Sequence, residues 1–199
     1  MEYEVRAARP EDLAGLPPIE SSGDAMFAEI GIVFPPGPTV VEQMIEKGAE
    51  ILVAGPPPNG APPAGASPGG DLPGGALPDG ALPGGASPVG FAALEEVDGA
   101  VHLEQISVRG DLVGRGIGAR LLDAVMARAA AEGAPGVSLL TFRDVPWNEP
   151  WYARHGFAEL PEERWGPEIR SYWDAEIKAG LHELGPRLVM WAAAARRPS

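Results

Sequence analysis

Three glycines at the start of a helical pattern are the residues of this 199-residue chain whose spacing most clearly suits chemistry. Gly114, Gly116 and Gly118 follow a strand-like run at 101–108 and precede apolar residues spaced for one face of a helix. Glycines let a ligand approach the backbone closely, and the first N–H groups of a helix point outward with a favourable dipole. The spacing therefore predicts an anion site, with a phosphate or pyrophosphate as its ligand.

Two phosphate-binding patterns can be compared with this stretch. A P-loop requires Lys and then Ser or Thr after its glycines, but Ala119 and Arg120 stand there instead. Gly114, Gly116 and Ala119 formally match the dinucleotide pattern G-x-G-x-x-A. That pattern places its glycines directly after the strand, whereas here five residues separate Val108 from Gly114. A dinucleotide site and a turn without a ligand both stay open on these grounds.

The longer motif R-G-D-L-V-G-R-G-I-G-A-R-L-L resembles the acyl-CoA loop of the GNAT superfamily of N-acetyltransferases. The family loop reads Gln/Arg-x-x-Gly-x-Gly/Ala. Gly116 and Gly118 stand at its glycines, and Val113 stands where Gln or Arg is usual. This difference removes one polar side chain but leaves the backbone N–H groups, and Arg115 stays available for a phosphate.

A second motif, N-E-P-W-Y-A-R-H-G-F, resembles the family's signature of an Asn followed by a Tyr and then Gly-Phe. Tyr152 and the pair Gly156-Phe157 match it, while Asn148 lies nearer to the tyrosine than is usual. By this resemblance Tyr152 is the acid that protonates the leaving thiolate, with a core tyrosine as the alternative. Asn148 either contacts the cofactor or caps a helix.

The resemblance also implies roles for the strand at 101–108. In the family the equivalent strand splays from the next one, so its free backbone groups hold the pantetheine arm, and the Val108 N–H becomes the candidate oxyanion donor. Glu104 is then the candidate base for the amine, against a surface carboxylate, and His102 is a weaker alternative base. The implied acetyl-CoA contacts are Ile106, Val108, Val113, Gly114, Arg115, Gly116, Ile117, Gly118 and Asn148.

The fold implied by this resemblance is α/β (α+β), a mixed, centrally splayed sheet with helices on both faces. The implied function is transfer of an acetyl group from acetyl-CoA to a primary amine, by direct attack in a ternary complex. The acceptor is a small molecule or a protein N-terminus. A non-catalytic acyl-CoA-binding module is the alternative, followed by a dinucleotide-binding protein.

Composition narrows the classes of partner. The formal net charge of −13 argues against nucleic acid and favours cationic partners, although solubility alone accounts for it equally well. The absence of cysteine excludes a disulfide, a thiolate zinc site and a cysteine nucleophile, and we expect no metal. With no signal-like start and no apolar run of roughly 20 residues, we expect a soluble cytoplasmic protein without membrane contact. A homodimer stays open.

One domain, 1–199, is expected, with an insertion at 55–88 made of Pro- and Gly-rich five-residue repeats. Such repeats bury too little surface to fold, so we expect a disordered tract at the tip of a β-hairpin. Ser21, Ser22 and Gly23 are expected to interrupt the helix that begins after Pro10. The expected strands lie at 3–7, 50–54, 89–96, 101–108, 137–142, 157–160 and 187–192.

Overall fold

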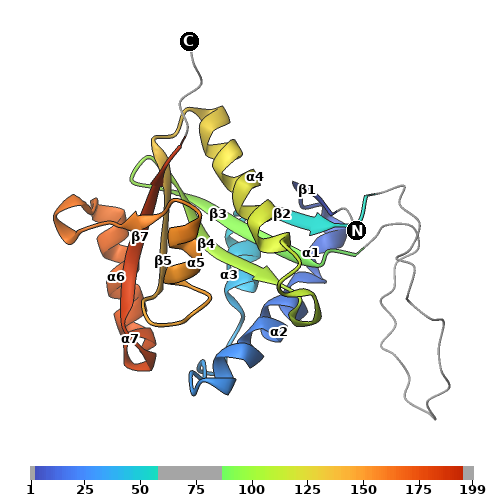
Figure 1. Ribbon diagram of the computed structural model, residues 1–199, viewed down its shortest axis with the longest axis horizontal. Helices are drawn as coiled ribbons and strands as arrows, with labels where there is room; N and C mark the ends of the chain where they lie inside the picture. The colour runs from blue at the N-terminus through green and yellow to red at the C-terminus, as the bar shows by residue number, and fades with distance from the viewer. Residues whose placement is uncertain (1–2, 58–86, 195–199) are drawn as a thin grey trace.

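The computed structural model describes residues 3–57 and 87–194, and within them seven strands form one mixed sheet in the order β1-β2-β3-β4-β5-β7-β6 (Figure 1). The strands are β1 (Glu4–Ala7), β2 (Glu50–Gly55), β3 (Gly90–Val97), β4 (Ala100–Val108), β5 (Gly136–Phe142), β6 (Ala158–Glu159) and β7 (Arg187–Ala193). The helices are α1 (Pro10–Leu13), α2 (Leu16–Glu29), α3 (Val40–Lys47), α4 (Ile117–Glu132), α5 (Glu149–Arg154), α6 (Pro167–Lys178) and α7 (Leu181–Leu184), with 3-10 turns η1 (Gly110–Leu112) and η2 (Glu162–Arg164).

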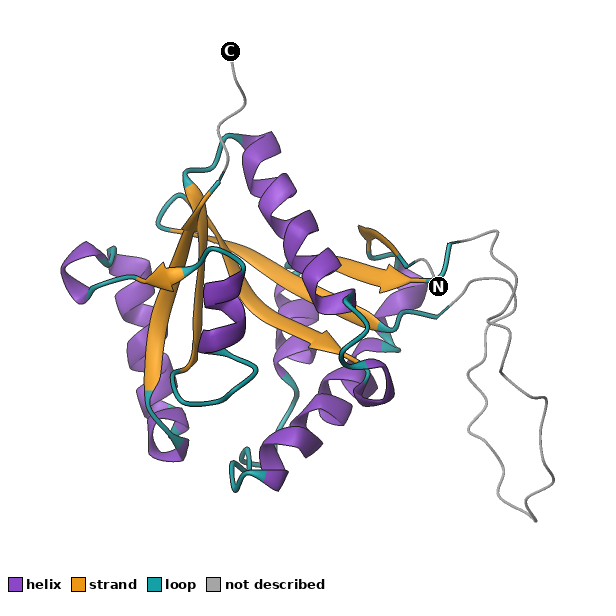
Figure 2. Cartoon of the chain, viewed as in Figure 1, coloured by secondary structure: helices purple, strands orange, loops and turns teal. Residues whose placement is uncertain are grey.

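Helices cover both faces of the sheet, as the predicted fold class requires (Figure 2). Alternate strand residues face opposite sides, so each strand contributes to two cores. On one face α4 and α5 pack on the largest core, which includes Leu103, Leu121 and Tyr152. On the other face α2 and α3 cover Phe91 of β3, and α6 covers Val189 of β7.

The strands β4 and β5 are parallel neighbours that pair over only two positions. The paired residues are Val101 with Val137 and His102 with Ser138. Beyond this point β5 pairs with β7 along its whole length, while β4 continues beside β3, so β4 and β5 run apart in Figure 1. The sheet is therefore splayed at its centre, as predicted.

A β-bulge interrupts β4 where this separation begins. Leu103 pairs with Leu94 of β3 and Gln105 pairs with the adjacent Ala93, so Glu104 is an extra residue on β4. A bulge of this kind bends the strand and changes the direction of side chains. Glu104 is thus placed at the bend where β4 leaves β5.

Helix α2 corrects one sequence-based expectation. It is a single helix of 14 residues and is not interrupted at 21–23. The Ser22 hydroxyl donates to the Ile19 carbonyl at 2.7 Å and accepts from the Gly110 N–H at 3.0 Å, so its polar group is satisfied without leaving the helix. Leu16 and Ile19 are buried against the sheet, and this packing outweighs the weak helix propensity of Ser and Gly.

The strands on either side of the repeat tract form the predicted antiparallel pair, with Ile51 opposite Ala93 and Ala54 opposite Gly90. Most of the insertion predicted at 55–88 lies outside the described residues, and its expected disorder stays a prediction. Within the described ranges, no helix has both the length and the apolar character needed to cross a membrane.

Candidate functional site

The glycine loop joins η1 to α4 and is held in backbone conformations that favour glycine. Gly114 has φ 81° and Gly116 has φ 76°, both in the left-handed region, and Gly116 is the N-cap of α4. Gly114, Arg115 and Gly116 are exposed, and Ile117 anchors the helix start in the core. The loop therefore presents its backbone to solvent at a fixed position.

The N–H groups of this loop are available for a ligand. From Gly114 to Ala119, none of the six donates to an acceptor in the part of the chain that the structure describes. The next one, Arg120 N–H, donates to the Gly116 carbonyl at 3.2 Å and begins the helical pattern. No side chain caps the helix, so an anion is the natural partner for these donors.

Charged side chains border the loop. Arg109 holds Asp111 by two hydrogen bonds, at 2.6 Å and 3.1 Å, and closes the turn that precedes the loop. This pairing lowers the pKa of Asp111, chiefly through the hydrogen bonds from Arg109. Arg115 is exposed and forms no ion pair with a described residue, so its guanidinium is free to reach a phosphate.

Helix α5 packs directly against the start of α4. A Cβ added at Gly118 would lie 3.6 Å from the indole ring of Trp151, and that ring also meets Tyr152 edge to face with centroids 4.9 Å apart. The two motifs recognised in the sequence thus meet in space. Trp151 itself was not predicted as a site residue, because its place next to the loop depends on how α5 docks.

The direction of the β4 N–H groups follows from its pairing with β3. The Arg109 N–H donates to the Val89 carbonyl at 2.9 Å, and Val108 is paired with Gly90. Hydrogen-bonded and non-hydrogen-bonded pairs alternate along an antiparallel ladder. The N–H groups of Val108 and Ile106 therefore point away from β3, toward the gap that opens between β4 and β5.

Glu104 lies at the edge of this gap, with its side chain 24% exposed. Its Oε2 lies 3.5 Å from Nε2 of His102, whose ring is only 1% exposed. The two side chains share a face, as predicted. His102 is thus buried behind Glu104, and Glu104 is the better placed of the two to meet an acceptor.

Tyr152 is a buried member of α5, only 8% exposed, and it packs in the core with Trp151 and Phe157. Burial raises the pKa of Tyr152 above its usual value, and the positive charge of Arg187 opposes this shift. The phenol is therefore protonated at neutral pH, as an acid must be. The packing suits a core tyrosine equally, so its catalytic role stays a prediction.

Asn148 is the N-cap of α5, but its side chain does not cap the helix. Its carbonyl accepts from the N–H groups of Trp151 and Tyr152, at 2.9 Å and 3.0 Å, and its N–H donates to the Val145 carbonyl. The amide side chain has no hydrogen bond to a described residue. This leaves it available for the cofactor, one of the two roles expected for it.

The face of the sheet that α2, α3 and α6 cover carries side chains from segments far apart in the sequence. Tyr172 of α6 donates to Glu95 of β3, and its ring lies 4.9 Å from that of His102. Phe27 and Phe34 pack with centroids 5.2 Å apart and belong to a cluster that also includes Ile32, Phe142, Val145, Trp147 and Leu184. The sequence offered no signal for Glu95, Ser138 or Tyr172, because only the register of the sheet brings them together.

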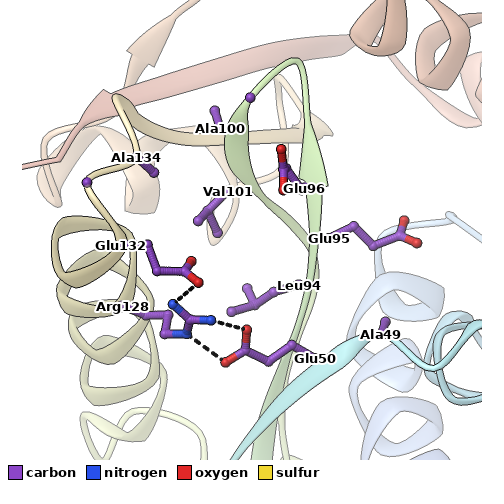
Figure 3. Close-up of a pocket in the computed structure, with 12 residues that line it drawn as sticks. Ala49, Glu50, Leu94, Glu95, Glu96, Ala100, Val101, Arg128, Glu132 and Ala134 are labelled. Atoms are coloured by element: carbon purple, nitrogen blue, oxygen red, sulfur yellow. Dashed lines mark hydrogen bonds and ion pairs between the residues drawn. The ribbon is translucent and has the colours of Figure 1, made fainter.

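A depression of about 640 Å³ lies elsewhere, near the C-terminal end of α4 (Figure 3). Figure 3 shows Arg128 of α4 between Glu50 of β2 and Glu132, with ion pairs to both. None of the residues predicted for the site lines it. Since its one cation is already paired with two carboxylates, this depression is a poor match for a phosphate ligand.

The comparisons with known proteins agree with this geometry. Residues 84–159 match the family model described as an acetyltransferase (GNAT) domain, a segment that contains the gap, the glycine loop and α5. Within this segment the chain is therefore similar to a GNAT acetyltransferase domain. Among residues 3–57 and 87–194, no group of three or more His, Cys, Asp or Glu side chains could hold a metal ion.

Solved structures share the fold at low identity. An acetyltransferase of the GNAT family from Staphylococcus aureus is 13% identical with a TM-score of 0.61, over 98% of this chain and 100% of that one. The ribosomal-protein-S18-alanine N-acetyltransferase from Escherichia coli is 12% identical with a TM-score of 0.57, over 100% and 97%.

The N-acetylglutamate synthase from Neisseria gonorrhoeae, complexed with coenzyme A and N-acetyl-glutamate, is 16% identical with a TM-score of 0.61. The similarity covers 98% of this chain and 36% of the synthase chain, so this chain spans little more than a third of that protein.

Proposed function

We propose that this protein transfers the acetyl group of acetyl-CoA to a primary amine by direct attack in a ternary complex. The observation that carries the proposal is the separation of β4 from β5 after two paired positions, which leaves N–H groups of β4 without a partner strand. The N–H groups of the glycine loop likewise donate to no described residue. A thioester with a phosphorylated carrier needs both sets of N–H groups, one for its carbonyl oxygen and pantetheine arm and one for its phosphates.

The donor molecule lies along this row of N–H groups. Its pyrophosphate binds the loop 113–118, where Val113, Gly114, Gly116, Ile117 and Gly118 offer backbone contacts and Arg115 adds a positive charge. The pantetheine arm follows Ile106 and Val108 of β4, and Asn148 contacts it from α5. The Val108 N–H then points at the thioester carbonyl and stabilises the oxyanion.

The reaction needs two proton transfers. The amine attacks only in its neutral form, so Glu104 takes its proton, directly or through one water molecule. As the tetrahedral intermediate collapses, the C–S bond breaks and the thiolate takes the proton of the Tyr152 hydroxyl. Holding both reactants in one gap contributes the orientation that a bimolecular reaction lacks.

The acceptor is a small-molecule amine or a protein N-terminus. Two proteins of the same fold support this range, since one is named an N-acetylglutamate synthase and the other a ribosomal-protein-S18-alanine N-acetyltransferase. The acidic balance of the chain, −13, favours a cationic acceptor by steering. A cytoplasmic location and a homodimer stay predictions.

The test is a thiol-release assay with acetyl-CoA and a panel containing an alkylamine, an amino acid and a short peptide with a free N-terminus. We expect amine-dependent release of CoA and an acetylated product of the matching mass. Failure of the folded protein to bind acetyl-CoA in native mass spectrometry would overturn the proposal. Binding without transfer to any amine of a broad panel would indicate a non-catalytic acyl-CoA module instead.

A further inference from the structure

His102 occupies the point where β4 and β5 separate. It is paired with Ser138 in the last rung of the short parallel ladder, and both residues are buried, at 1% and 2% exposure. The His102 Nδ1 lies 2.8 Å from the Ser138 Oγ. A side-chain hydrogen bond therefore joins the two strands immediately before the gap and fixes the plane of the imidazole ring.

Three side chains, from β4, α6 and β3, lie near this ring. Glu104, two residues along β4, places its Oε2 3.5 Å from the His102 Nε2. Tyr172 of α6 packs against the ring at 4.9 Å between centroids. Glu95 of β3 is the direct cross-strand partner of His102, and its carboxylate is engaged by the Tyr172 hydroxyl and, at 3.5 Å, by the Lys47 ammonium.

These contacts select one tautomer of the neutral ring. A bare Nε2 would set a lone pair against the Glu104 carboxylate, and two acceptors facing each other repel. With the proton on Nε2, the ring donates toward Glu104, and Nδ1 becomes an acceptor for the Ser138 hydroxyl. Ser138 is a suitable donor, because its hydroxyl has no other hydrogen-bond partner among the described residues.

We propose that His102 is a positioning residue for Glu104, held by Ser138 as the Nε2–H tautomer. The ring donates toward Oε2 of Glu104, so that Oε1 keeps its lone pairs for the proton of the acceptor amine. This role rests on the proposed function, in which Glu104 is the base. His102 neither gains nor loses a proton during the reaction, which separates this role from that of a general base.

The first test needs no acceptor amine. Long-range ¹H–¹⁵N correlation spectra of the full ¹⁵N-labelled chain distinguish protonated from bare ring nitrogens, and only three histidines contribute. The His102 signals are assigned by their loss in His102→Gln. We expect a protonated Nε2 and a bare Nδ1 at neutral pH, and a mixture of tautomers in Ser138→Ala. A protonated Nδ1 in the wild-type protein would overturn the inference.

The second test is kinetic and uses the amine of the panel that reacts fastest. Ser138→Ala should lower kcat about tenfold, part of the ~10²–10⁴-fold typical of general-base help, and leave the KM for acetyl-CoA unchanged. Ser138→Thr keeps the hydroxyl and should restore most of the rate, which a purely structural role for Ser138 would not require. His102→Gln retains an N–H donor and should lose less than His102→Leu.

Glu104→Gln distinguishes the base role of Glu104 from the positioning role of His102. If Glu104→Gln slows the reaction and both Ser138→Ala and His102→Leu keep the wild-type kcat, the positioning role is wrong and the base assignment stands. If Glu104→Gln itself leaves kcat unchanged, the base assignment fails and the role of His102 fails with it. Thermal unfolding of each variant checks that the buried substitutions leave the fold intact.

Discussion

The loop 113–118 differs from the sheet face covered by α2, α3 and α6 in the groups that it presents. The loop presents main-chain N–H groups, held in place by glycines with positive φ and by the start of α4. That face presents side chains, among them Glu104 of β4, Tyr172 of α6 and Phe34 of the loop between α2 and α3. Under the proposed function, the donor side is thus set by backbone geometry, whereas the acceptor side depends on residue identity.

This difference explains why the donor is easier to infer than the acceptor. A pyrophosphate can be bound by any loop of the right backbone conformation, so a shared fold and glycine spacing carry the argument. The acceptor pocket can change by substitution without any change of fold. The two sides should therefore respond separately to mutation.

The largest effect is expected for Gly116→Asp on the donor side. The substitution strains a residue at φ 76° and places a negative charge among the N–H groups of the loop. Loss of two charge-assisted hydrogen bonds, at about 1.5 kcal/mol each, weakens CoA binding ~100-fold. Isothermal titration calorimetry with CoA measures this loss of affinity.

Gly116→Asn is the matched control. Asn tolerates a left-handed backbone, has nearly the size of Asp and carries no charge. It should retain most of the affinity. Equal losses in both variants would show that strain, and not charge, is responsible, and unchanged affinity in a folded Gly116→Asp would remove the loop from the donor site.

Tyr152→Phe tests the proposed role of the Tyr152 hydroxyl as the acid that protonates the leaving thiolate. The change keeps the ring and its packing on Trp151 and deletes the hydroxyl. General acid help is typically ~10²–10⁴-fold, so kcat should fall at least ~10-fold while acetyl-CoA still binds. A smaller loss would point to water as the source of the proton.

The pH dependence separates Tyr152 from Glu104. A base is needed only while the amine is protonated, so the defect of Glu104→Gln should shrink as pH rises and the amine loses its proton unaided. Because burial raises the pKa of Tyr152, the tyrosine defect should persist over the same range. If neither change slows the reaction, both assignments are wrong and orientation alone accounts for catalysis.

Phe34→Leu tests the acceptor side alone. Phe34 packs on Phe27 and lies 6.3 Å from Phe142 between ring centroids. If this aromatic cluster lines the acceptor site, the KM for the amine should rise roughly tenfold or less, in line with small changes of an apolar pocket. The affinity for CoA should not move, and a parallel loss of CoA binding would break the proposed separation of the two sides.

The stability of the protein should also depend on pH in the acid range, because an ion pair joins Arg6 of β1 to Asp12 of α1. Arg6 donates to Asp12 at 2.6 Å and 3.0 Å, and these hydrogen bonds are the main cause that lowers the pKa of Asp12. A lowered folded pKa stabilises the protein above the unfolded value near 4, and this stabilisation is lost as pH falls through the folded pKa.

Asp12→Asn should therefore lower Tm by about 4–8 °C at neutral pH, for a loss of on the order of 2 kcal/mol. The difference from wild type should shrink below about pH 4. Asp111→Asn is the control, because its exposed pair with Arg109 should contribute little. A difference between wild type and Asp12→Asn that stays constant down to pH 2 would contradict the account.

The smallest effect is expected from the repeat tract. Deleting residues 56–87 and joining β2 to β3 by a short turn should leave both Tm and CoA affinity nearly unchanged, because loop-closure entropy depends weakly on length. Thermal unfolding and CoA titration of the shortened chain test this. A large drop in Tm would show that the tract packs on the domain.

Features that local chemistry determines can be read from the sequence. Thr39 and Glu42 form the capping box that begins α3, and Gly133 ends α4 at φ 72°. Gly116 marks the start of α4, and the hairpin turn at Asp98 and Gly99 has positive φ at both residues. Each of these signals acts within a few residues of the structure that it determines.

Features that depend on register could not be predicted in this way. Ser138 and His102 are 36 positions apart, and Tyr172 and Glu95 are 77 apart, so only the completed sheet and the docking of α6 bring them together. The continuity of α2 was also missed, because Ser22 finds partners at Ile19 and Gly110 that propensity does not anticipate.

The most direct test of the central claim is a crystal structure of the protein with acetyl-CoA. The account predicts the pyrophosphate within hydrogen-bond distance of the N–H groups of Gly114–Ala119, and the thioester carbonyl within hydrogen-bond distance of the Val108 N–H. Acetyl-CoA bound elsewhere, for example in the depression beside Arg128 (Figure 3), with the β4–β5 gap empty, would contradict it.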